Sequence, residues 1–202
     1  MDTDDLLVNY FSQYITLSSE EIQLIKNEDI VQEYKKDHVL LREGQVAQRC
    51  FLVLKGCVKR YYLEDGEEKI MEFYTENDPI APASYATKEP SEYYLSCVES
   101  CLISTGTEES TQRFLQEFPR FVPMFVKIGD SLTAKKQVSM DDFKNLSPEG
   151  RYQKLLETKP DLVNRVPQYM IASYLGIQPE SLSRIRKRIW TDNKNASTSE
   201  IK

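Results

Sequence analysis

The spacing of apolar positions divides the chain into three stretches. In residues 2–28 apolar side chains recur at helical intervals and predict two short helices, the second starting at the capping sequence of residues 18–21. From about residue 31, short apolar runs are separated by turn residues. The runs predict strands at residues 39–41, 50–54, 58–62, 70–74, 93–95 and 101–103. Gly44, Gly56 and Gly66 punctuate them at intervals of 12 and 10 residues, the spacing of a compact antiparallel barrel or roll.

Helical spacing returns near Thr107. It predicts a short helix through Phe118, a long helix from Pro119 to about Phe143, and a further helix that starts at residues 146–149. Four apolar residues of the long helix step by 4, 3 and 4 and form a coiled-coil-like seam: Phe121, Phe125, Ile128 and Leu132. We interpret this seam as the contact between two copies of the chain. The alternative is that the stripe packs on the chain's own roll.

Residues 166–190 predict two short helices that meet at a sharp corner. Gly176 suits the left-handed conformation that ends the first helix, and Pro179 suits the first turn of the second. On the second helix one stripe is apolar and consists of Leu182, Ile185 and Ile189. The opposite stripe is polar and consists of Glu180, Ser183, Arg184 and Lys187. This pattern is typical of a helix-turn-helix, and the alternative is an ordinary helical hairpin with a solvated basic face.

The polar stripe contains the side chains that read duplex DNA. Arg pairs with the O6 and N7 atoms of guanine, Glu accepts from the N4 amino group of cytosine, and Lys neutralises phosphate. With the flanking polar positions added, the predicted DNA-contacting set is Gln168, Gln178, Glu180, Ser181, Ser183, Arg184, Lys187 and Arg188.

The distribution of charge agrees with a single DNA-binding end. The whole chain carries a net charge of -6. Residues 145–202 contain ten Lys/Arg against six Asp/Glu, whereas residues 1–144 contain 16 against 26. The C-terminal end therefore has a net charge of +4 and the remaining body one of -10, as expected if only that end meets phosphates.

The N-terminal sequence and the cysteines indicate the compartment. Residues 1–11 are acidic and lack the basic start and apolar core of a signal peptide, and no run approaches the roughly 18 apolar residues of a membrane span. We therefore expect a cytoplasmic protein with no membrane partner. Its four cysteines are expected to be reduced and to act as small buried apolar residues: Cys50, Cys57, Cys97 and Cys101. A redox role for Cys97 and Cys101 is the alternative.

Several stretches resemble the bacterial Crp/Fnr superfamily of transcription regulators. In the predicted roll they are residues 42–44 (REG), 51–58 (FLVLKGCV) and 65–67 (DGE), and in the second helix residues 180–184 match the E-x-x-S-R recognition pattern of the Fnr branch. The resemblance implies a homodimer that binds a near-palindromic promoter site and contacts RNA polymerase. It also implies that Glu180, Ser183 and Arg184 read base edges.

The chain departs from the family pattern at two places near the helix-turn-helix. The family often adds a two-stranded wing after the recognition helix, but only 12 residues, most of them polar, follow Trp190. Many members place a phosphate-binding Arg just before the first helix, where this chain has Pro167 and Gln168. Gln168 can still donate a hydrogen bond to a phosphate, although without charge.

The roll lacks the residues with which cyclic-nucleotide-binding members hold their ligand. Those members use a Gly-Glu pair and, about ten residues later, an Arg followed by Ser or Thr. The corresponding residues here are 78–84 and 91–93, and Glu92 stands about where the phosphate-binding pair belongs. Between residues 70 and 105 the one basic residue, Lys88, is outnumbered by six acidic residues. We therefore expect no binding of cyclic AMP or cyclic GMP, because an anion there would meet like charges.

Other site chemistry is also missing from the sequence. No cysteine precedes Cys50, although an N-terminal iron–sulfur cluster would need several, and the single histidine, His38, is interpreted as structural. There is no phosphate-binding glycine loop and no cluster of metal ligands, so we expect no enzyme, no cofactor and no metal. Tyr74, Tyr85, Tyr93 and Tyr94 could line a pocket for a neutral or aromatic ligand, but packing is the simpler interpretation.

The expected fold class is α+β. An antiparallel β-roll of the cyclic-nucleotide-binding-like, jelly-roll type with N-terminal helices spans residues 1–107, connecting and dimerisation helices span 108–145, a helix-turn-helix domain spans 146–190, and 191–202 form a disordered tail. The expected function is sequence-specific regulation of transcription. The alternative is an effector-sensing or protein-interaction module whose helix-turn-helix no longer binds DNA.

Overall fold

The computed structural model describes residues 3–27 and 30–199. Helices α1 (Thr3–Ser12) and α2 (Ser19–Asn27) precede strands β1 (Val31–Tyr34), β2 (Val39–Leu41), β3 (Cys50–Lys55), β4 (Val58–Glu64), β5 (Glu67–Tyr74) and β6 (Pro79–Ile80). Helix α3 (Ala83–Thr87), strands β7 (Tyr94–Cys97) and β8 (Cys101–Gly106) and helix α4 (Glu108–Glu117) follow. A 3₁₀ turn (Pro119–Phe121) leads into α5 (Val122–Asn145), and the chain ends with α6 (Pro148–Thr158), α7 (Leu162–Arg165), α8 (Gln168–Tyr174) and α9 (Pro179–Ser199).

The strands form a roll of two antiparallel four-stranded sheets. Their strand orders are β1-β8-β3-β6 and β2-β7-β4-β5. Alternate residues of both sheets fill the space between them, and Val53, Val58, Leu95 and Ile103 have no measurable exposure. The predicted α+β class is confirmed. Sequence reasoning did not resolve β1, β6, α3 and α7, which are between two and five residues long.

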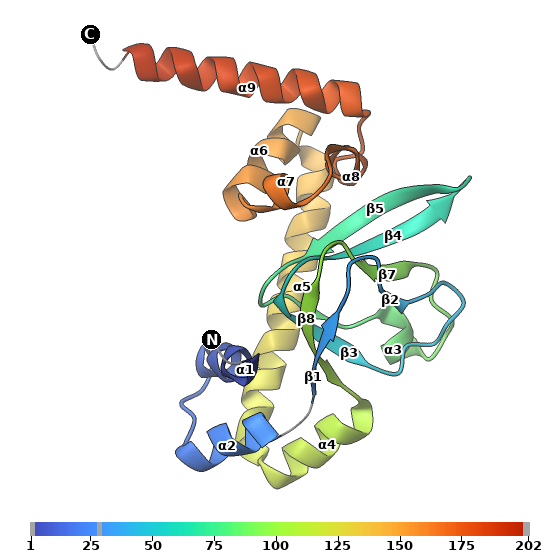
Figure 1. Ribbon diagram of the computed structural model, residues 1–202, viewed down its shortest axis with the longest axis vertical. Helices are drawn as coiled ribbons and strands as arrows, with labels where there is room; N and C mark the ends of the chain where they lie inside the picture. The colour runs from blue at the N-terminus through green and yellow to red at the C-terminus, as the bar shows by residue number, and fades with distance from the viewer. Residues whose placement is uncertain (1–2, 28–29, 200–202) are drawn as a thin grey trace.

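The long helix α5 runs past the roll and joins it to the C-terminal helices (Figure 1). The predicted seam is wrong at Phe121, and Ile128 is only partly exposed. Phe121 is 1% exposed and packs its ring against Phe114 and Phe118, at centroid distances of 4.9 and 6.3 Å. Ile128 packs against the apolar cluster formed by α1, α2 and β3. A 3-4 spacing of apolar residues predicts that a helix face is buried, but it does not say which surface covers that face. Here other parts of the same chain cover it.

A different face of α5 is apolar and open. Val122, Val126 and Met140 are 42%, 57% and 60% exposed. At 100° per residue the three lie within about 40° of one another, on one side of the helix. Val138 and Phe143 of α5 are also exposed, at 54% and 55%, but they lie to either side of this stripe.

The predicted disordered tail is helical in the structure as far as it is described. Helix α9 continues past Trp190 to Ser199, and residues 200–202 lie outside the described residues. No Gly or Pro interrupts this stretch, and extending an existing helix gains a backbone hydrogen bond for each residue added. The Thr191 hydroxyl also donates to the Lys187 carbonyl at 2.9 Å.

Candidate nucleic-acid interface

Helices α8 and α9 form the predicted helix-turn-helix. Gly176 has the left-handed φ of 67°, and the Ile177 N–H donates to the Ala172 carbonyl at 3.0 Å, the six-residue loop of a glycine-ended helix. The Gln178 carbonyl then accepts hydrogen bonds from the N–H groups of Ser181 and Leu182, so α9 begins at Pro179 as predicted. The local sequence therefore fixes the corner.

The apolar stripe of α9 is buried as predicted. Leu182 and Ile185 pack into one cluster with Ile171, Ala172 and Leu175. Ala172 is fully buried in this cluster. Its small side chain allows the two helices to cross closely. Burying this stripe turns the opposite side of α9 outward.

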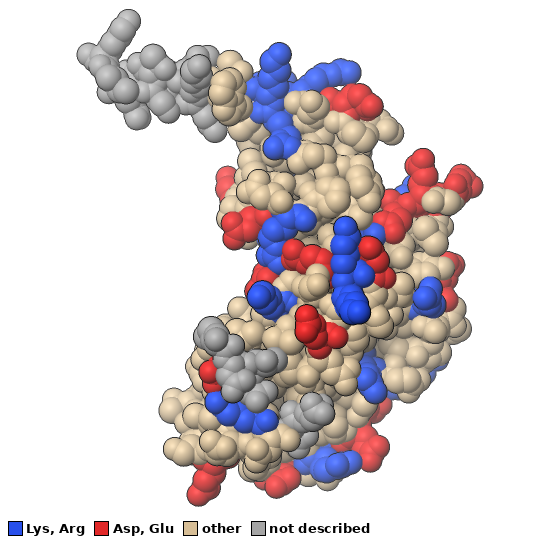
Figure 2. All heavy atoms as spheres, viewed as in Figure 1, with Lys and Arg blue, Asp and Glu red and all other residues tan. Residues whose placement is uncertain are grey.

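The structure places the predicted DNA-contacting residues at the surface. Seven of the eight are exposed and Ser181 is half-buried: Gln168, Gln178, Glu180, Ser183, Arg184, Lys187 and Arg188 are the exposed ones. Figure 2 shows Lys and Arg side chains along α9 at one end of the molecule. Within the described residues, the side chains of Arg184 and Lys187 make no hydrogen bond or ion pair. Their donors are therefore free to meet a ligand.

Arg188 differs from its neighbours. Its guanidinium forms a two-pronged ion pair with the carboxylate of Glu149 on α6, including an Nε to Oε1 hydrogen bond of 2.9 Å. By helical geometry Arg188 also lies at the flank of the polar stripe, about 80° from Glu180. Arg188 would have to give up Glu149 before it could contact a phosphate.

The helix-turn-helix is attached directly to the roll, which the sequence did not indicate. Strand β5 is an edge strand, and α8 lies against its free edge. The Ser173 hydroxyl accepts a hydrogen bond from the Ile70 N–H at 3.0 Å and donates one to the Glu68 carbonyl at 3.1 Å. A side chain of the helix-turn-helix thus satisfies backbone groups that an edge strand leaves unpaired.

Near the stretches in which the resemblance would place a nucleotide site, residues 78–84 and 91–93, several polar groups bond to one another. The Tyr93 hydroxyl accepts a hydrogen bond from the N–H of Ala83, the first residue of α3, at 2.9 Å. The guanidinium of Arg60 lies over the Tyr93 ring, 5.4 Å from its centroid, and pairs with Glu72 at 3.5 Å. Lys88 points to a different partner, Glu108, at 2.9 Å. The nearby cations already have carboxylate partners.

Three of the four cysteines are buried in the roll: Cys57, Cys97 and Cys101. Burial raises the pKa of the Cys57 thiol to about 12 and that of the half-buried Cys50 to about 11. Both thiols therefore stay protonated at neutral pH and behave as small apolar groups. Within the described residues, no group of three or more His, Cys, Asp or Glu side chains is arranged to hold a metal ion.

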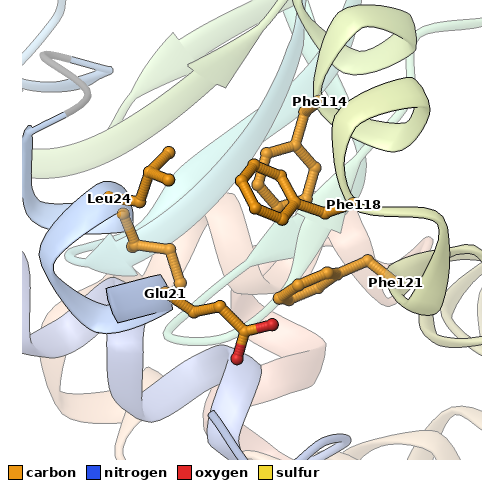
Figure 3. A pocket seen from close by; sticks show the side chains of 6 residues that line it. Glu21, Leu24, Phe114, Phe118 and Phe121 are labelled. Carbon is orange, nitrogen blue, oxygen red and sulfur yellow. The ribbon is translucent and has the colours of Figure 1, made fainter. Parts of the chain in front are cut away.

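A shallow apolar cleft lies between α2 and α4, away from the helix-turn-helix (Figure 3). The rings of Phe114, Phe118 and Phe121 line one side of it. On the other side the carboxylate of Glu21 accepts a hydrogen bond from the N–H of Ser18, as the predicted capping sequence requires. The cleft belongs to the packing that anchors the start of α5.

Comparisons with known proteins agree with this architecture. Residues 31–118 match the family model of the cyclic nucleotide-binding domain. Among solved structures, FixK2 from Bradyrhizobium japonicum superposes with a TM-score of 0.66 at 18% identity, over 81% of this chain and 85% of that one. The chain has the fold of the Crp/Fnr regulators. No curated protein sequence matches it.

Two further structures extend the likeness. The cyclic di-GMP-responsive global regulator CLP of Xanthomonas campestris gives a TM-score of 0.59 at 16% identity, over 81% of this chain and 87% of that one. The catabolite activator protein of Thermus thermophilus gives 0.51 at 16% identity, over 89% and 87%. The printed names of both proteins describe regulators, and the likeness to this chain is one of fold. None of its helices, in the residues that the structure describes, is long and apolar enough to cross a membrane.

Proposed function

We propose that this protein is a cytoplasmic, sequence-specific DNA-binding regulator of transcription. The observation that carries the proposal is the outer face of α9, where Arg184 and Lys187 are exposed and have no partner among the described residues. Arg184 suits a guanine edge, Glu180 a cytosine amino group, and Lys187 a phosphate. Hydrogen bonds to DNA around these three residues would come from Gln168, Gln178, Ser181 and Ser183. Arg188 would contact DNA once its ion pair with Glu149 is broken.

The proposal includes a homodimer formed through the open face of α5. The apolar stripe at Val122, Val126 and Met140 is exposed in the single chain, and α5 is about 36 Å long at 1.5 Å per residue. A second copy related by a two-fold axis would cover this stripe with the same residues. One recognition helix would then face each half of a near-palindromic promoter site, where RNA polymerase is a further partner.

The proposal excludes cyclic AMP and cyclic GMP as effectors. The N–H group of Ala83 that a cyclic phosphate would meet is bonded to the Tyr93 hydroxyl, and the Arg60 charge is paired with Glu72. A nucleotide would have to displace the tyrosine and break the ion pair. A calorimetric titration should detect no micromolar binding of either nucleotide, and such binding would contradict this part of the proposal.

The decisive experiment for DNA binding is a selection from random duplexes followed by affinity titrations at several salt concentrations. Enrichment of a two-fold symmetric motif, with affinity that falls steeply as salt rises, is the expected outcome. Arg184→Ala should weaken binding by about 1 to 3 kcal/mol per half-site and relax preference at one position. The matched control is Arg113→Ala, which removes an exposed Arg from α4. No enrichment would favour an interaction module that no longer binds DNA.

A further inference from the structure

The roll and the C-terminal helices share one apolar core. Tyr61, Ile70 and Phe73 of the β4–β5 hairpin lie in the same buried cluster as Met170 and Ile171 of α8. Tyr174 adds to this contact by packing its ring 5.4 Å from that of Phe73. The helix-turn-helix is therefore docked on its own roll, and the question is what sets the geometry of the docking.

One arginine makes a polar clamp across this interface. Arg165, at the end of α7, donates two hydrogen bonds to Glu76, at 2.9 and 2.8 Å, and two to Glu99, at 3.0 and 2.5 Å. Glu76 lies after β5 and Glu99 lies in the turn between β7 and β8. Glu76 is itself held by the Gly56 N–H at 2.8 Å. Both carboxylates thus belong to the roll, and the cation belongs to the DNA-binding unit.

The clamp is directional as well as charged. A guanidinium is planar, and when it binds two carboxylates at once it fixes both distance and orientation. The side chain of Arg165 is 25% exposed, so solvent screens the clamp only in part. Lys159 adds a second tie, from the end of α6 to Asp78 at 2.8 Å and to the Phe73 carbonyl at 2.7 Å. The Lys159 ammonium, at the end of a flexible side chain, does not fix the orientation of the two units as the planar Arg165 guanidinium does.

The covalent connection alone would leave the DNA-binding unit free to pivot. Helices α5 and α6 are joined by only Leu146 and Ser147. Arg151 braces this link by donating to the carbonyls of Leu146 and Leu175, at 2.9 and 2.8 Å. Within the described residues, the hydrogen bonds of Arg151 join α6 to the end of α5 and the end of α8. Arg165 acts across the interface instead.

We propose that Arg165 is a positioning residue for DNA recognition: by clamping each helix-turn-helix to its own roll it fixes the separation of the two recognition helices in the dimer. The protein is then selective for the spacing between half-sites as well as for their sequence. This inference rests on the proposed function. Its physical basis is bivalent binding, in which a rigid connection favours one span and a loose connection tolerates several.

The test compares the full-length protein with Arg165→Gln on duplexes that carry two copies of the selected half-site. The spacing between the copies is varied one base pair at a time, and a duplex with a single half-site is measured in parallel. For each protein the preference is the ratio of its affinity for the best spacing to its affinity for the neighbouring spacings. This ratio should be about tenfold smaller for Arg165→Gln than for the wild type. Its affinity for the single half-site should change less than about threefold, because Arg165 does not belong to the α9 face.

A second measurement reports the docking without DNA. In the free protein the Ile70 amide donates to Ser173, so its hydrogen exchange is slow only while α8 is docked. Arg165→Gln should accelerate this exchange, whereas the control Arg113→Gln should leave it unchanged. A triple variant that also carries Glu76→Gln and Glu99→Gln removes the repulsion left between the carboxylates. It should exchange more slowly than Arg165→Gln alone.

The outcomes separate the two proposals. If the wild type enriches no motif, the proposed function fails, and the exchange data alone decide whether Arg165 clamps the interface. If the wild type binds DNA but Arg165→Gln keeps both the spacing profile and the Ile70 exchange rate, the inference about Arg165 is overturned. Equal losses on single and paired half-sites would also overturn it, because they would show a local defect in the DNA-binding unit.

Discussion

Replacing Ser173 with Ala tests the attachment of the helix-turn-helix to the roll. The substitution removes two hydrogen bonds to the edge strand, one from the Ile70 N–H and one to the Glu68 carbonyl. Each contributes about 0.5 to 1.5 kcal/mol net, a total of about 1 to 3 kcal/mol. Alanine recovers about 0.5 kcal/mol through its higher helix propensity. The expected loss in the free energy of unfolding is therefore about 0.5 to 2.5 kcal/mol.

Urea denaturation measures this loss, and Ser131→Ala is the matched control. Ser131 is an exposed helical serine of α5 whose side chain makes no hydrogen bond within the described residues. Its replacement should leave stability unchanged or slightly increased. Amide exchange at Ile70 supplies a second measurement, because the Ser173 variant should exchange faster there. If Ser173→Ala is as stable as the control and Ile70 stays equally protected, the docking described here does not hold the helix-turn-helix in solution.

Three further predictions concern the roll, the dimer and pH. Gly56→Ala should lower stability by about 2 to 5 kcal/mol in thermal melts, because φ is 102° and an added Cβ would lie 2.7 Å from the Cys101 Sγ. Val126→Arg should shift sedimentation toward the single chain without lowering its stability, since the side chain is already exposed. Burial alone would raise the pKa of Glu76 and of Asp78, but their basic partners together with backbone N–H donors outweigh it and lower both pKa values. These carboxylates therefore add stability that is complete above about pH 4 to 5 and is lost as the pH falls through their folded pKa values. In thermal melts at decreasing pH, the double variant Glu76→Gln, Asp78→Asn should therefore lose less stability than the wild type.

Much of the local structure follows from short-range rules that act within a few residues. The glycine-ended helix at Gly176, the capped start of α4 at Thr107 and the Ser18 capping box depend on neighbouring backbone and side-chain groups. The two faces of α9 depend on helical periodicity alone. For this reason the sequence predicted the starts of α2, α4, α6 and α9 and the residues of α9 that turn outward, including Glu180 and Arg184.

The same rules do not say what covers an apolar stripe. Phe121 and Ile128 have the spacing of a dimer seam, yet both pack on their own chain, while Val126 is the exposed one. Which surface meets a stripe depends on contacts between residues far apart in the sequence, and periodicity carries no information about them. The helical course of residues 191–199 is likewise inherited from the folded α9 in front of them.

The sequence by itself determined the class of fold, the order of its parts and the polar face that we propose meets DNA, because each depends on local pattern. Only the tertiary structure decided how the helix-turn-helix sits on the roll. Arg165 is 66 residues from Glu99 and 89 from Glu76, and Ser173 is 103 from Ile70. No local pattern in the sequence predicts contacts between residues so far apart. The clamp exists because folding brings a cation and two carboxylates from three segments to one place.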